Sequence, residues 1–142
     1  MPVYEQILAA IDFGEHSPTV VRRASAIAQQ CSANLMFFTV VDSGGTANKE
    51  FSASGMDDNE ELLIESARKR LNELVDAEAP GTNFTTLVVS GRAKVELSRV
   101  AERERADLIV VGAHVRHGFA DLFGSTAAPL LQSACCDVLT VR

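Results

Sequence analysis

The chain has 142 residues, a length that fits one domain built around a single hydrophobic core. Hydrophobic residues make up 46% and charged residues 23%, which is an ordinary composition for a globular protein. The net charge of −6 argues against nucleic acid as the main partner, because duplexes are bound through many positive side chains. A nucleotide remains open as a ligand, since it needs only one locally positive pocket.

The first residues, MPVYEQILAAIDFG, are interpreted as a strand rather than a signal peptide, because no basic stretch precedes a long apolar run. No apolar stretch approaches the roughly 20 residues that cross a bilayer, so no membrane partner is expected. The three cysteines are interpreted as small apolar residues, since no Cys or His pairs show zinc-site spacing. We therefore expect a cytoplasmic protein with reduced thiols and no metal site.

Apolar runs and amphipathic stretches alternate from the start of the chain. Residues 7–11 predict a strand, and residues 17–31 predict a helix with Ser17 as N-cap and Pro18 at its first position. The inward face of that helix would carry Val20, Ala24, Ile27, Ala28 and Cys31. The unbroken apolar run at 34–41 is typical of a parallel-sheet strand that is buried on both faces.

The middle of the chain continues the alternation after a loop expected over 42–56. A helix is predicted over 57–78, where the acidic run DDNEE would complement the helix dipole in the first turn. Its buried stripe would consist of Leu63, Ala67, Leu71 and Leu74. Residues 84–89 predict a third strand and residues 93–105 a third helix.

Residues 107–111 form the most apolar strand, which we expect at the centre of the sheet. A last helix is predicted over 126–134 and a last strand over 137–141. Alternating strands and helices predict a parallel sheet with helices on both faces, joined by right-handed crossovers. The fold expected for residues 1–142 is a single doubly wound α/β domain, with a five-stranded parallel sheet in the order 3-2-1-4-5.

Doubly wound sheets bind ligands beyond the carboxyl ends of their strands. Two common phosphate-binding fingerprints, GxxxxGK[ST] and GxGxxG, are absent. The segment Gly124-Ser125-Thr126 instead precedes the last predicted helix, whose first N–H groups and dipole would form an anion site. Glycine would let a phosphate approach the backbone, and the two hydroxyls would add donors. The alternative is that Ser125 only caps the helix.

Positive side chains accompany this segment in the loop after Gly112. Arg116 is the best phosphate partner among them, because its guanidinium is always charged and fork-shaped. His114 and His117 would be mostly neutral at pH 7 unless a phosphate raised their pKa. The alternative is that these loop charges are simply solvated. No nucleophile–base pair or metal cluster is visible, which favours a binding protein over an enzyme.

Three stretches together resemble the universal stress protein family over nearly the whole chain: ILAAIDFGEHS, VVSGRAKVELSRVAERERADLIVVG and GSTAAPLLQSACCDVLTVR. The resemblance implies a stress-response protein that binds ATP or a related adenine nucleotide. It also implies that Asp12 contacts the adenine and that Val40 packs against it. The alternative for Asp12 is a partner within the local turn or a cap for the following loop. Val41 would take the place of Val40 if the register is shifted by one, and the alternative for both valines is plain core. The expected nucleotide-binding residues are Asp12, Val40, Gly112, His114, Arg116, Gly124, Ser125 and Thr126.

The family's nucleotide-binding pattern is Gly, two residues, Gly, nine residues, Gly and then Ser or Thr. Gly112 matches its start, and Gly124 and Ser125 match its end. Val115 replaces the middle glycine, and residues 116–123 make a spacer of eight instead of nine. A second reading is therefore a dimeric module of the A type, the family branch that lacks these glycines and is not expected to bind ATP.

A third reading is slow ATP hydrolysis, with His114 or His117 as the base. The last strand is apolar, and an apolar edge strand invites pairing. In the family it forms homodimers, so a homodimer with unknown protein partners is expected.

Overall fold

The computed structural model describes residues 3–41, 52–113 and 136–142. In these ranges the strands are β1 (Gln6–Ala10), β2 (Asn34–Val41), β3 (Thr85–Ser90), β4 (Leu108–Gly112) and β5 (Asp137–Val141). The helices are α1 (Ser17–Cys31), α2 (Ser52–Glu78) and α3 (Ala93–Arg103). All strands are parallel, in the order β3-β2-β1-β4-β5, which confirms the expected sheet.

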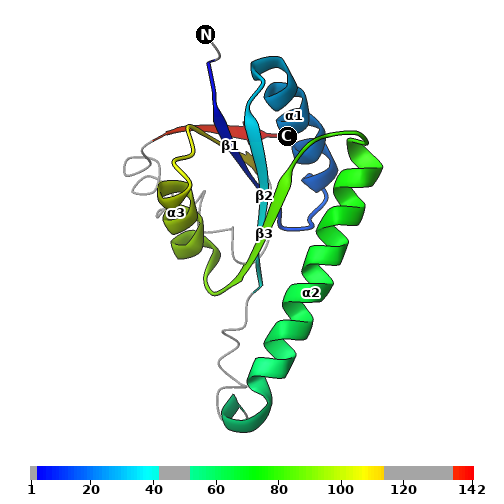
Figure 1. The fold of residues 1–142 in the computed structure, drawn as a ribbon, viewed down its shortest axis with the longest axis vertical. Helices are drawn as coiled ribbons and strands as arrows, with labels where there is room; N and C mark the ends of the chain where they lie inside the picture. The colour runs from blue at the N-terminus through cyan, green and yellow to red at the C-terminus, as the bar shows by residue number, and fades with distance from the viewer. Residues whose placement is uncertain (1–2, 42–51, 114–135) are drawn as a thin grey trace.

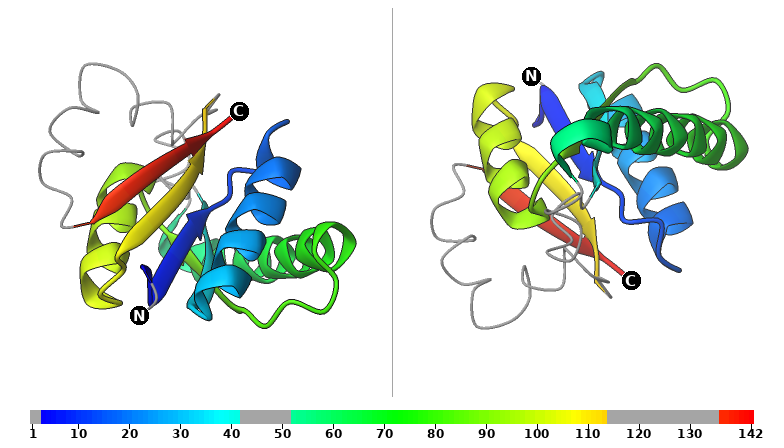
Figure 2. Two further views of the ribbon diagram at one scale, coloured as in Figure 1. Left: turned by 90° about the horizontal axis from the view of Figure 1, so that it is seen from above. Right: turned by 90° about the horizontal axis from the view of Figure 1, so that it is seen from below.

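The sheet separates two hydrophobic cores. Helices α1 and α2 cover one face and α3 lies on the other, as the ribbon views show (Figure 1, Figure 2). Ile7 and Ala9 of β1 belong to the first core, whereas Leu8 and Ala10 belong to the second. Successive side chains of a strand point to opposite faces, so a continuous apolar run is what a strand between two helical layers requires.

The middle of the sheet is β1, and the expectation that residues 107–111 would occupy it is wrong. Strand β4 lies between β1 and β5, one position away from the centre. Its side chains are nevertheless buried from Leu108 to Val111. A highly apolar strand indicates that both of its faces are buried. Every interior strand of such a sheet is buried on both faces, so apolarity does not identify the central one.

Helix α1 begins differently from the prediction. His16 is the N-cap, with φ −91° and ψ −3° and no side-chain cap hydrogen bond, and Ser17 is the first helical residue. The Ser17 hydroxyl donates to Oδ1 of Asp12 at 3.1 Å, so Ser17 is not the N-cap. A hydrogen bond to a carboxylate is stronger than one between neutral groups, which explains why the hydroxyl turns to Asp12.

Helix α2 is longer than expected. It has 27 residues and begins at Ser52, five residues before the predicted start, so the acidic run lies beyond the first turn. Extending a helix costs little once later turns have formed, which allows a start among small residues. The remainder of the expected loop, 42–51, lies outside the described residues.

The first half of α2 extends past the ends of the strands (Figure 1). Leu63, expected in the buried stripe, is therefore 49% exposed, and its neighbour Leu62 is 67% exposed. Further along, Leu71 and Val75 are fully buried in the first core. Helical periodicity identifies the inward face of a helix, whereas the length of the sheet determines how much of that face is covered.

Polar contacts fix the amino edge of the sheet. Asp107 accepts backbone hydrogen bonds from Glu5 at 2.9 Å and Gln6 at 3.0 Å, and so joins the start of β4 to that of β1. The Tyr4 hydroxyl donates to Asp137 at the start of β5, at 2.8 Å. In the described ranges, no helix has the length and apolarity that crossing a membrane requires.

Candidate functional site

Three of the sequence-predicted residues meet at the carboxyl edge of the sheet. Asp12 follows β1, Val40 lies near the end of β2, and Gly112 ends β4. Ala10 pairs with Phe38, so Asp12 and Val40 stand at equivalent positions two residues further on. Ala9 pairs with Val110, which puts Gly112 level with the residue before Asp12. The three strands are neighbours, so the sheet itself brings these residues together.

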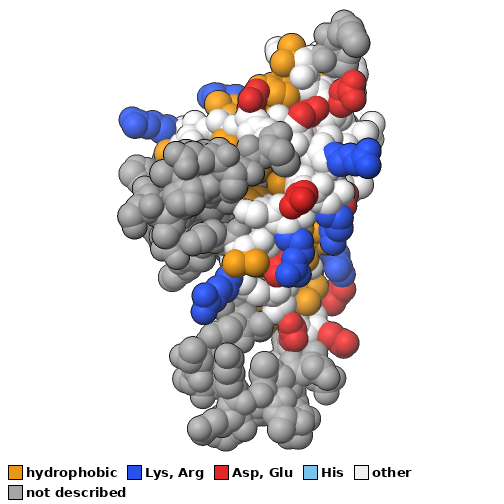
Figure 3. Space-filling model, turned by 90° about the vertical axis from the view of Figure 1, so that its left-hand side faces the viewer, with side chains coloured by type: hydrophobic (Ala, Val, Ile, Leu, Met, Phe, Trp, Pro, Cys, Tyr) orange, Lys and Arg blue, Asp and Glu red, His pale blue; other side chains and the backbone are white. Residues whose placement is uncertain are grey.

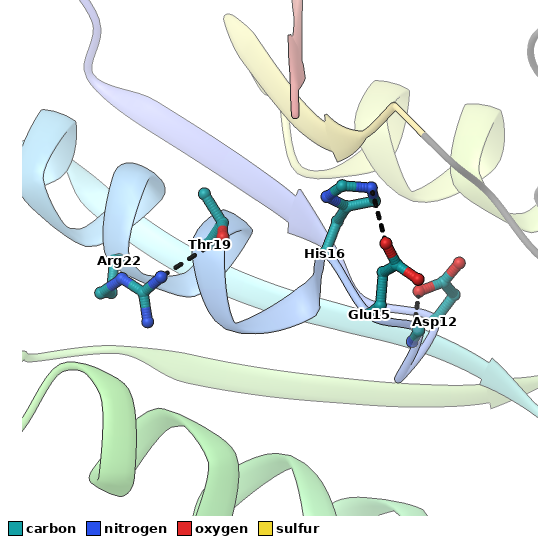
Figure 4. Close-up of polar contacts among 6 residues, drawn as sticks. Asp12, Glu15, His16, Thr19 and Arg22 are labelled. Atoms are coloured by element: carbon teal, nitrogen blue, oxygen red, sulfur yellow. Dashed lines mark hydrogen bonds and ion pairs between the residues drawn. The ribbon is translucent and has the colours of Figure 1, made fainter.

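The Asp12 carboxylate is held by its own turn. Oδ1 accepts a hydrogen bond from the Gly14 backbone N–H at 2.8 Å and another from the Ser17 hydroxyl at 3.1 Å. Figure 4 shows the carboxylate in the turn between β1 and α1. Aspartate commonly bonds the backbone two residues on, and this arrangement orients the carboxylate before any ligand arrives. The turn therefore presents an oriented negative charge.

Phe13 adopts a left-handed backbone conformation within this turn, with φ 60°. For a residue other than glycine this conformation costs about 1–2 kcal/mol. The Phe13 ring packs against the first core, and the Arg70 guanidinium lies 4.3 Å from the ring centroid. A cation over an aromatic ring contributes about 0.5–1 kcal/mol at an exposed position. Sequence reasoning did not single out either residue, because a single aromatic and a helical arginine carry no local pattern.

Gly112 brings β4 close to the first turn of α1. A Cβ atom at this position would lie 3.3 Å from Cβ of His16 and 3.6 Å from Cγ2 of Val20. A glycine at this position therefore allows β4 to pack closely against α1, which is a structural role in addition to the expected one beside a ligand. Figure 4 shows the His16 imidazole on the side of the turn that faces β4, and its Nε2 lies 3.7 Å from the Glu15 carboxylate.

Val40 is half-buried and packs against the second core, beside α3. Its neighbour Val41 packs against the first core on the opposite face. The buried Thr39 hydroxyl donates to the Ile11 carbonyl at 2.7 Å, which ties β2 to β1 just before the site. This hydrogen bond holds the end of β2 beside β1, next to Val40.

The remaining candidates, His114, Arg116, Gly124, Ser125 and Thr126, lie outside the described residues. Val115 and the helix predicted over 126–134 lie there as well. The described site consequently comprises the strand ends and the β1–α1 turn. Among the described residues, no group of three His, Cys, Asp or Glu side chains is placed to hold a metal ion.

A groove of about 810 Å³ lies at the opposite edge of the sheet. The end of α1, the start of β2 and the segment between α2 and β3 line it, and it includes none of Asp12, Val40 and Gly112. On the face of the molecule that carries α3, described positive and negative side chains lie intermingled (Figure 3). Neither feature adds to the carboxyl-edge site.

The strand order and the residues at the carboxyl edge define a doubly wound α/β protein with its candidate site at the usual ligand-binding edge. The model of the universal stress protein family matches residues 3–142, and the chain belongs to that family.

Known relatives cover nearly the whole chain. Universal stress protein A homolog 1 of Coxiella burnetii is 39% identical over 140 residues, which is 97% of this chain and 96% of the relative. A universal stress protein solved in complex with cAMP has 24% identity and a TM-score of 0.66, covering 98% of this chain and 97% of its own. The universal stress protein of Archaeoglobus fulgidus in complex with dAMP has 17% identity and a TM-score of 0.61, with 99% of each chain covered.

Proposed function

We propose that this protein binds ATP or a related adenine nucleotide as a regulatory ligand at the carboxyl edge of the sheet. The observation that carries the proposal is the Asp12 carboxylate, oriented by Gly14 and Ser17 at the end of the central strand. A carboxylate can accept a hydrogen bond from the exocyclic amine of adenine. Two structural relatives were solved with the adenine nucleotides cAMP and dAMP, which supports this ligand class.

Val40 would form the apolar contact for the base, since it stands at the position equivalent to Asp12 on the neighbouring strand. The phosphates would extend toward the chain after Gly112, where the sequence contains His114, Arg116 and the segment Gly124-Ser125-Thr126. Local positive charge and helical N–H groups are needed there, because the whole chain carries a net charge of −6.

Calorimetry with ATP, GTP and adenosine tests the proposal. ATP should bind at or below millimolar concentration, and GTP more weakly, because guanine carries a carbonyl where adenine has its amine. Asp12→Asn should weaken the binding of ATP about fivefold, since a hydrogen bond to a charged acceptor contributes about 1 kcal/mol more than one to a neutral acceptor. The absence of binding at millimolar ATP would contradict the proposal.

We further propose that the protein acts by binding, in the cytoplasm, and is not an enzyme. Slow ATP hydrolysis is the enzymatic alternative and would need His114 or His117 as a base. Gly124→Val should abolish both nucleotide binding and any hydrolysis. Hydrolysis that survives this substitution would come from a contaminant.

The second candidate function is a dimeric interaction module that binds no nucleotide. It is favoured by the 39% identity to a relative named universal stress protein A homolog 1, and by Val115 within a shortened loop. Val115→Gly separates the two functions. If the native chain binds no ATP and Val115→Gly does, Val115 prevents nucleotide binding, which contradicts the first proposal and favours the second.

A further inference from the structure

We propose that Arg70 and Phe13 form a clamp that fixes the β1–α1 turn and thereby positions the Asp12 carboxylate for its ligand. Arg70 is the positioning residue and acts through Phe13. The ligand part of this inference rests on the proposed function, whereas the clamp itself is a property of the ligand-free turn.

The backbone of Phe13 connects the clamp to Asp12. Phe13 lies between Asp12 and Gly14, and the Gly14 N–H donates to Oδ1 of Asp12 at 2.8 Å. The backbone angles φ and ψ of Phe13 together determine where that N–H points, and φ is 60°, in the left-handed region. A phenylalanine holds this conformation only where its surroundings over-determine it, and such strain concentrates at functional sites. Any force that holds the ring therefore also holds the donor of Asp12.

The ring is held from two sides. Its inner side packs against the first core, and the Arg70 guanidinium lies 4.3 Å from the centroid. Arg22 and Arg68 pair with the carboxylates of Glu78 and Glu65. No ion pair of Arg70 is found in the part of the chain that the structure describes, where its contact is the Phe13 ring.

The position of Arg70 on α2 makes the clamp stiff. The next residue, Leu71, is fully buried in the first core, and Val75 one turn later is buried there too. The backbone that carries Arg70 is therefore anchored to the same core as the inner side of the Phe13 ring. The clamp thus links α2 to the turn at the end of β1.

Amide hydrogen exchange of Gly14 in the ligand-free protein tests the clamp. Arg70→Gln should accelerate this exchange about two- to fivefold, the factor expected from losing one exposed cation–aromatic contact. Lys69→Gln, which removes the same charge from the neighbouring exposed position, should leave the exchange rate unchanged. Arg70→Lys should restore part of the protection. Unchanged Gly14 exchange in Arg70→Gln would overturn the proposal.

A double-mutant cycle shows whether Arg70 acts through the ring. In a Phe13→Leu background, Arg70→Gln should have no further effect on Gly14 exchange, because the shared contact is already lost. Independent, additive effects of the two substitutions would overturn the clamp.

Binding of adenosine and ATP tests the consequence for the ligand. Arg70→Gln should weaken both by the same factor of about two to five, because adenosine lacks the phosphates and still needs Asp12. A loss confined to ATP and removed by high salt would mean that Arg70 attracts phosphates, which would overturn positioning through Phe13. If the native protein binds neither compound, the proposed function fails, while Gly14 exchange still decides whether the clamp exists.

Discussion

At the scale of single residues, the place of Asp12 could be predicted from the sequence, whereas the conformation of Phe13 could not. Asp12 is the polar residue that ends an apolar run, so its place at the carboxyl edge follows from the alternation of strands and helices. The Phe13 ring contacts Arg70 of α2, more than fifty residues away along the chain, so no local sequence pattern predicts the conformation of Phe13. The prediction that Ser17 is the N-cap was wrong for a local reason, because its hydroxyl donates to Asp12, five residues earlier, and does not cap the helix.

Gly112 gives a prediction about packing. Gly112→Ala should lower the free energy of unfolding by about 1 kcal/mol, because its Cβ would lie 3.3 Å from Cβ of His16 and the two elements would have to move apart slightly. Urea denaturation measures the effect, and Gly112→Val should cost more. A fully stable Gly112→Ala protein with weakened nucleotide binding would show that the glycine serves the ligand and not the packing.

Tyr4 gives a prediction about pH. Its hydrogen bond to the Asp137 carboxylate raises the pKa of Tyr4 above the usual 10.0. The native state therefore retains this proton more strongly than the unfolded state does, so the contribution to stability is present below pH 10 and is lost as pH rises through the raised pKa. Tyr4 is the one tyrosine of the chain, so absorbance of its phenolate reports the titration directly. Asp137→Asn should move the midpoint down toward 10, and an unmoved midpoint would contradict the assigned cause.

At the scale of elements, the inward face of α2 was predicted correctly, whereas the length of that face that is buried was not. Its periodicity identified Leu71 as inward, yet the same pattern also included Leu63, which is half exposed beyond the strands. Periodicity is a property of the helix alone, whereas burial requires a neighbour. The length of that neighbour is set by β2 and β3, which are separate stretches of sequence.

The two leucines make a matched pair for measurement. Leu71→Ala should lower the free energy of unfolding by about 2–5 kcal/mol, as for other fully buried leucines. Leu63→Ala should change it by less than about 0.5 kcal/mol, because the side chain is 49% exposed. Urea denaturation of both variants measures the difference. Equal losses would mean that the first half of α2 is covered in solution.

At the scale of the whole molecule, the alternation of elements and the resemblance to a family were sufficient to predict the sheet. The predicted strand order was confirmed, whereas the separate expectation that the most apolar strand is central was wrong, because apolarity cannot distinguish one interior strand from another. The strand ends of the candidate site were predictable once the sheet was known, since parallel strands end at one edge. The contacts from Gly14 and Ser17 to Asp12 are local to its turn, whereas the contact between Arg70 and Phe13 was not predictable, because it arises only when α2 packs against that sheet.

The edge position of β5 leads to a prediction about assembly. In the described sheet β5 pairs with β4 alone, and an apolar edge strand is prone to pair with another chain. We expect a homodimer through this strand, with a mass by light scattering of twice the 15.2 kDa of one chain. A single 15.2 kDa species at micromolar concentration would contradict this expectation.

The parallel course of β5 has a practical consequence for experiments on this protein. Val141 pairs with Gly112, so Arg142 emerges at the same edge as the candidate site, whereas Gln6 begins β1 at the opposite edge. An affinity tag or surface linker fused after Arg142 would start beside Gly112 at the edge of the candidate site. Attachment ahead of residue 3 leaves that edge clear, and binding measurements are best made on protein tagged or immobilised there.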